Sequence, residues 1–69
     1  MDLIKINIGD RVTFENLLLE EKSGVVIKIE KSIFYPDDYT LSIVTIKIDD
    51  EGEEFAFLGR LKKEEYSNQ

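Results

Sequence analysis

The residue types that most often perform catalysis are missing from this chain. Its 69 residues include no histidine and no cysteine, which removes the usual catalytic bases, nucleophiles and transition-metal ligands. No disulfide can form, and the sequence holds no glycine-rich phosphate loop. Carboxylate pairs remain, but glycosidase-type chemistry needs a cleft with two acids set across it, which so small a domain rarely holds. The sequence therefore predicts a protein that is not an enzyme and that uses no cofactor or metal.

One cluster of carboxylates nevertheless needs an explanation. It consists of Asp49, Asp50, Glu51, Glu53 and Glu54, with Gly52 among them. A calcium loop needs ligands at alternating positions and a bidentate glutamate at its end, and this spacing does not supply them. A solvated hairpin turn explains the cluster, with Gly52 providing a positive φ. The charges would also discourage aggregation between sheet edges.

The least expected feature is the run Leu17-Leu18-Leu19, which is followed directly by charged residues. This run fits either a helical turn that ends at Gly24 or a long hairpin arm. Two of the leucines would then cover an open end of the core, or all three would form an exposed apolar patch. Such patches usually mark interfaces, so exposure of all three leucines would imply a tight protein partner or a homodimer.

The elements that must position these residues are short strands. Apolar and polar residues alternate with a period of two, and the apolar residues are mostly β-branched or aromatic, which is typical of half-buried strands. In this alternation Val25, Ile27 and Ile29 point inward, and Phe55 and Phe57 belong to the core. The pattern predicts strands near 3–7, 10–16, 24–31, 40–48 and 53–58, with a brief sixth at 60–63.

The fourth of these strands breaks the alternation. Leu41 and Ile43 fall on the face opposite Val44, Ile46 and Ile48. A β-bulge near residues 42–44 would return both sets to the core. Alternatively, Leu41 and Ile43 point outward and cover a loop.

Length and charge set further limits. The chain allows one domain, which we expect over residues 1–63, with a polar and flexible tail at 64–69. The formal net charge is −6, from 15 acidic and 9 basic residues. No segment approaches the roughly 20 apolar residues that cross a bilayer, and the first residues do not form a signal peptide. These observations predict a cytoplasmic protein.

The order of motifs resembles the bacterial SH3-like barrels, a superfamily that includes KOW and Tudor-type domains. The residues that carry the resemblance are Gly9-Asp10-Arg11-Val12, Gly24-Val25-Val26-Ile27, the hairpin at 49–52 and Leu58-Gly59-Arg60-Leu61. The resemblance implies an all-β fold, a small SH3-like barrel of five to six strands with room for one short helical turn. A small OB-like barrel is the alternative, but residues 32–40 are too short and turn-like for the helix that OB folds usually carry.

The resemblance also suggests how such a barrel would bind. Tudor-like barrels can cage a methylated cation with aromatic rings, and the long loop here offers Phe34, Tyr35 and Tyr39. The alternative is that Phe34 or Tyr35 closes one end of the barrel. KOW-type barrels contact RNA, but the basic residues here alternate with acidic ones, and cross-strand ion pairs are the simpler explanation.

The sequence thus favours a non-catalytic protein-interaction module that binds its partner through the loops at 16–22 and 32–40. Exposed loops on a rigid scaffold are the usual binding sites. The candidate contact residues are Leu17, Leu18, Leu19, Phe34, Tyr35 and Tyr39. The alternative is a protein linked to nucleic acid, either as a weak binder or as an acidic mimic that inhibits a nucleic-acid-binding protein. The second form would suit the small phage or mobile-element proteins that the chain also resembles.

Overall fold

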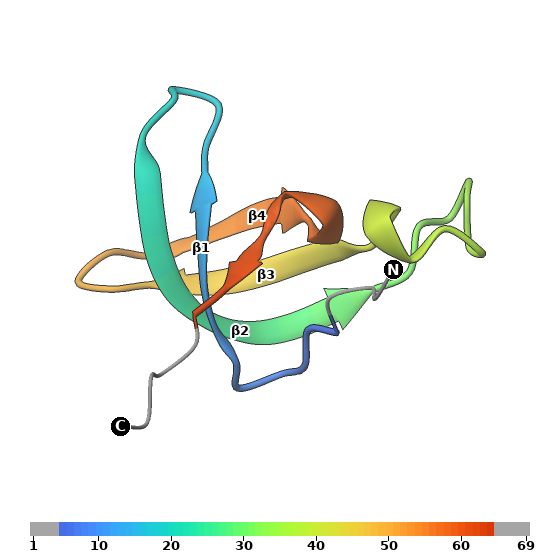
Figure 1. The fold of residues 1–69 in the computed structure, drawn as a ribbon, viewed down its shortest axis with the longest axis horizontal. Coiled ribbons are helices and arrows are strands. Elements are labelled where there is room, and N and C mark those ends of the chain that lie inside the picture. Colours follow the sequence, from blue (N-terminus) through green and yellow to red (C-terminus); the bar gives the residue numbers. More distant parts are fainter. Residues whose placement is uncertain (1–4, 65–69) are drawn as a thin grey trace.

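The computed structural model describes residues 5–64, and within them the chain forms one antiparallel sheet. The strand order is β4-β3-β2-β1-β5 (Figure 1). The strands are β1 (Arg11–Glu15), β2 (Glu21–Glu30), β3 (Ile43–Ile48), β4 (Glu53–Phe57) and β5 (Lys62–Lys63). Two short 3₁₀ turns complete the described part, η1 (Tyr39–Leu41) and η2 (Leu58–Arg60). The all-β prediction is confirmed.

Several predicted strands begin at other residues in the structure. Strand β2 begins at Glu21, three residues before its predicted start, and β5 begins at Lys62, two residues after its predicted start. The strand expected at 3–7 is not formed over residues 5–7, and the rest of that range lies outside the described residues. The strand expected at 40–48 begins only at Ile43. The side chain of Asp38 accepts a hydrogen bond from the amide of Thr40 at 3.1 Å and so caps η1. A side-chain cap of this kind satisfies a free backbone amide and favours the turn over an extended chain.

Strand β2 bends from its pairing with β1 to its pairing with β3 (Figure 1). Its register against β3 shifts between Val26 and Lys28, so Ile27 is an extra residue. A bulge of this kind bends its strand. The predicted bulge near residues 42–44 is therefore wrong, because the irregularity lies in β2. The assignment of Val25 and Ile27 to the core is also wrong, since Val26 is buried and Ile27 is exposed.

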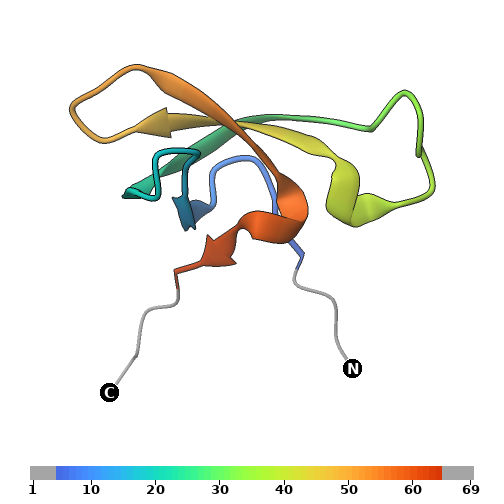
Figure 2. The same cartoon turned by 90° about the horizontal axis from the view of Figure 1, so that it is seen from above.

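The core lies between the two parts of this bent sheet. Seen from above, β3 and β4 lie on one side and β5 with η2 on the other (Figure 2). The buried residues are Ile6, Val12, Phe14, Val26, Val44, Ile46, Ile48, Leu58 and Leu61. Within the described residues no ladder joins β4 to β5, so the sheet is open and β4 is one of its edges.

Glu64, which the sequence assigns to the polar tail, is attached to β1. Its amide donates to the carbonyl of Arg11 at 2.9 Å, and its carboxylate accepts from the Thr13 hydroxyl at 2.7 Å. The Arg11 guanidinium also pairs with Glu64 at 3.3 Å and with Asp49 at the end of β3. The remaining tail, 65–69, lies outside the described residues.

The pair between Arg11 and Asp49 predicts a pH dependence of stability. The hydrogen bond from Arg11 lowers the pKa of Asp49 below its ordinary value of 3.8. A lowered carboxylate pKa contributes stability that is present above 3.8 and is lost as the pH falls through the folded value. We therefore expect Asp49→Asn to lower the urea midpoint at neutral pH, and the difference from the parent to narrow below pH 3.8.

The control for this measurement is Asp37→Asn, in the exposed loop between β2 and η1. Asp37 makes no ion pair with any residue in the range 5–64, so its substitution should leave the midpoint near that of the parent at every pH. A difference between Asp49→Asn and the parent that stays constant down to low pH would contradict the role assigned to Arg11.

Candidate functional site

The side chain of Asn16 holds the loop between β1 and β2 in a tight turn. Its Oδ1 accepts hydrogen bonds from the amides of Leu18 at 2.9 Å and Glu20 at 3.0 Å. Leu19 takes a positive φ of 62°. In this turn Leu17 is 100% exposed, and Leu18 and Leu19 are each 76% exposed. The alternative in which two leucines cover the core is therefore wrong, and the loop is a hairpin arm rather than a helical turn, because Gly24 lies inside β2.

Strand β4 carries two more exposed apolar side chains. Phe55 is 70% exposed and Phe57 is 51% exposed, so their predicted place in the core is wrong. The register explains the difference, because Val44 pairs with Ala56 and Ile46 pairs with Glu54. Cross-strand partners share one face of a sheet. The core face of β4 therefore carries Glu54 and Ala56, and the two phenylalanines lie on the opposite face.

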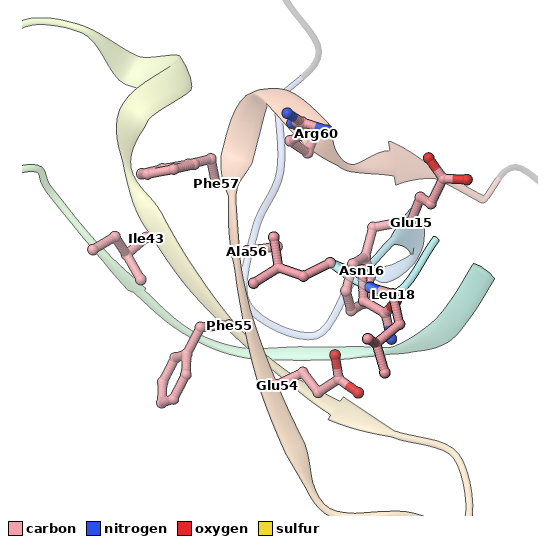
Figure 3. A pocket seen from close by; sticks show the side chains of 11 residues that line it. Glu15, Asn16, Leu18, Ile43, Glu54, Phe55, Ala56, Phe57 and Arg60 are labelled. Atoms are coloured by element: carbon pink, nitrogen blue, oxygen red, sulfur yellow. The ribbon is translucent and has the colours of Figure 1, made fainter. Parts of the chain in front are cut away.

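A groove of about 550 Å³ lies between this loop and β4 (Figure 3). In the close view Phe55, Phe57 and Ile43 lie on one side of the β4 ribbon, and Asn16 and Leu18 lie on the other. The apolar residues that line the groove are Phe14, Leu17, Leu18, Ile43, Phe55, Ala56 and Phe57. Leu17 and Leu18 are the two predicted contact residues that the structure places here.

A second groove, of about 400 Å³, lies beside the loop between β2 and η1. Its apolar lining comprises Ile33, Phe34, Tyr35, Leu41, Ile43 and Phe57. Leu41 and Ile43 thus point outward against this loop, as the alternative to a bulge predicted. Because Ile43 and Phe57 line both grooves, the two grooves form one continuous surface, which we call the apolar surface.

Two predicted contact residues lie outside the apolar surface. Tyr39 is half-buried, and its hydroxyl accepts from the amide of Ile6 at 3.0 Å and donates to the carbonyl of Ile6 at 3.3 Å. Tyr39 therefore holds Ile6 in place at the core. Leu19 lines a third and more polar hollow with Thr13, Glu21 and Lys62.

The charged side chains of the first groove are Glu15, Glu54 and Arg60. None of the three forms an ion pair with a residue in the range 5–64. Some carboxylates elsewhere are paired, such as Glu51, which accepts a hydrogen bond from Lys22 that raises the lysine pKa. The charge of Glu54 contributes to the same raised pKa of Lys22. The groove therefore holds two carboxylates and one guanidinium that are available to a ligand.

Sequence reasoning missed Phe55 and Phe57 as surface residues, and it did not name Ile43 among the contact residues. The length of the turn between β3 and β4 explains why the two phenylalanines were missed. Ile48 donates to the carbonyl of Gly52 at 2.9 Å, so the loop comprises only residues 49–51. The positive φ in this turn belongs to Asp50, at 60°, and not to Gly52 as predicted. A loop of three residues instead of four shifts the register by one and reverses the two faces of β4.

The described residues contain no group of three histidine, cysteine or acidic side chains that could hold a metal. None of the helical turns in the described range has the length and apolar character needed to cross a membrane. No protein-family model, curated protein or solved structure matches this chain. The geometry of the apolar surface is therefore the basis for a functional proposal.

Proposed function

We propose that this chain is a non-catalytic protein-interaction module built as a small SH3-like barrel. The observation that carries the proposal is the continuous apolar surface, in which two grooves share Ile43 and Phe57. Large contiguous apolar patches are uncommon on monomeric soluble proteins and mark binding sites. The absence of histidine and cysteine from the sequence supports the non-catalytic part of the proposal.

The order of the strands supports the barrel part of the proposal. The last strand, β5, returns to pair with β1 through Val12 and Thr13. The long β2 pairs with β1 on one side and with β3 on the other. A meander in which one bent strand serves both halves and the last strand returns to the first is the arrangement that the resemblance to SH3-like barrels implies.

The contacts of the module extend beyond the two loops. Leu18 comes from the first loop and Tyr35 from the second, and β4 contributes Phe55 to the first groove. Aromatic side chains in partly enclosed sites supply much of the binding energy at protein interfaces. Because β4 is held by its ladder with β3, it presents its phenyl rings from a fixed position.

The test uses immobilised chain and a lysate of the native cells. We expect Leu18→Glu and Phe55→Ser each to raise the Kd for the retained protein by about 30-fold, as for a central interface residue. Both side chains are exposed, so the thermal midpoint should change little. The matched control is Ile8→Glu, because Ile8 is 66% exposed and lines neither groove.

Salt separates this function from a link to nucleic acid. Binding to phosphate weakens steeply as salt rises, whereas binding through an apolar surface should change little. The proposed surface would be overturned if retention changed equally for Leu18→Glu, Phe55→Ser and Ile8→Glu. Retention that is lost at moderate salt and that Leu18→Glu and Phe55→Ser leave unchanged would favour the nucleic-acid alternative.

A further inference from the structure

The floor of the first groove includes the open edge of a strand. Ladder hydrogen bonds in antiparallel pairs occur at every second residue. At the two ends of the β3–β4 ladder, the amide of Ile48 donates to the carbonyl of Gly52 at 2.9 Å and the amide of Leu58 donates to the carbonyl of Ser42 at 2.8 Å. With the observed register, Glu54 and Ala56 bond to β3 and Phe55 does not. Phe57, two residues farther along, has the same orientation as Phe55.

The backbone amides of Phe55 and Phe57 and the carbonyl of Phe55 therefore point away from β3. No other segment within residues 5–64 donates to these three groups or accepts from them. Phe57 is the N-cap residue of η2, and its carbonyl belongs to that turn. An edge with unpaired backbone groups is a template for a further strand. Extended peptides bind to such edges by main-chain hydrogen bonds, and pockets beside the edge select their side chains.

The apolar surface offers pockets on both sides of this edge. Successive side chains of a strand point to opposite faces. An added strand would place one set of side chains against Phe55, Phe57 and Ile43, on one side of β4 in Figure 3. Its other set would meet Leu18 and Ala56, on the other side.

The charges in the groove select the type of strand. Glu15 and Glu54 make no ion pair with any described residue, and Arg60 is the one cation in the groove lining. The whole chain carries a net charge of −6, so a second copy would be repelled. Complementary charge favours the encounter with a basic partner.

From these features we propose that the partner contributes an extended segment that pairs with the edge of β4. The segment alternates apolar side chains with lysine or arginine and places a basic side chain near Glu54. This inference rests on the proposed function, since it names the class of partner for the same surface.

The probes are peptides selected from a displayed random library on the full chain. We expect the selected sequences to alternate apolar with basic residues. A selected peptide should slow amide hydrogen exchange at Phe55 and Phe57 by more than about tenfold at saturation, because ordered hydrogen bonds protect amides. Glu54 and Ala56, already bonded to β3, should change much less. This alternating pattern is specific to strand pairing.

Two matched comparisons complete the experiment. A peptide N-methylated at the positions that bond to β4 should lose binding, whereas methylation at the alternate positions should have little effect. Glu54→Gln should weaken the binding of a basic peptide several-fold more than Asp37→Gln does, since Asp37 lines neither groove.

Each outcome decides between the inference and the function it rests on. Selected peptides that bind without the alternating protection overturn strand pairing and leave the interaction module intact. The same holds if no peptide is selected while a protein partner is still retained through Leu18. Protection of Phe55 and Phe57 in the free chain, as a monomer or a dimer, also overturns the inference. Failure of both peptide selection and Leu18-dependent retention overturns the proposed function as well.

Discussion

Replacing Gly24 with alanine should lower the free energy of unfolding by about 3 kcal/mol or more. Overpacking typically costs about 1–3 kcal/mol, and this site lies at the upper end of that range. Gly24 pairs with Val12 of β1 and with Ile48 of β3, so β2 is enclosed on both sides there. A Cβ at this position would lie 2.8 Å from the carbonyl carbon of Lys47 and closer still to its oxygen. Backbone atoms in a central ladder cannot move away cheaply. Urea denaturation followed by circular dichroism measures the loss.

Gly52→Ala is the matched control for this substitution. A Cβ there would have no atom within 4 Å, and Gly52 is not at a positive φ. Alanine at a compatible glycine position stabilises by about 0.4–1 kcal/mol, because it reduces the freedom of the unfolded chain. The two substitutions should therefore act in opposite directions. Equal effects would mean that β2 and β3 do not approach each other as described.

Ile46→Ala should cost about 2–5 kcal/mol, the range found when a buried isoleucine is truncated. Ile46 is fully buried at the centre of the core. A domain of this size has only about 3–5 kcal/mol of stability, so most of the variant should be unfolded at physiological temperature. Thermal denaturation followed in the far ultraviolet measures the change.

Ile27→Ala provides the comparison, because the two isoleucines are indistinguishable in the sequence pattern. Ile27 is exposed at the bulge in β2, and truncation of an exposed side chain usually changes stability by less than about 0.5 kcal/mol. If Ile27→Ala and Ile46→Ala were equally damaging, Ile27 would belong to the core and the bulge would be wrongly placed.

The strands whose alternation is uninterrupted could be predicted from the sequence. In β1, Val12 and Phe14 are buried as the alternation requires. In β3, Val44, Ile46 and Ile48 are buried in the same way. A period-two pattern predicts which side chains of a strand are buried when the alternation continues without interruption along the strand.

The faces of β2 and β4 could not be predicted because each depends on a single residue. One extra residue at Ile27 changes the phase within β2. One residue fewer in the turn changes the phase of the whole of β4 relative to β3. Since the side-chain period of a strand is two, a shift of one residue exchanges buried and exposed faces.

The candidate site was predicted in part for the same reason. The two loops were identified by residue type, and Leu17, Leu18, Phe34 and Tyr35 line the grooves. The two phenylalanines of β4 that also line the grooves were assigned to the core. The position of Tyr39 outside the two grooves was not predicted, because its hydrogen bonds to Ile6 join residues far apart in the chain, and no local pattern reveals such a contact.

The two hydrogen bonds that Asn16 accepts have a consequence for how binding would proceed. They hold the leucine-bearing turn in one conformation before any partner arrives. A preorganised loop loses less conformational entropy on association, so more of the contact free energy remains as affinity. Complexes of this type form with little backbone rearrangement. Removal of the Asn16 amide would thus weaken binding even though Asn16 itself need not touch the ligand.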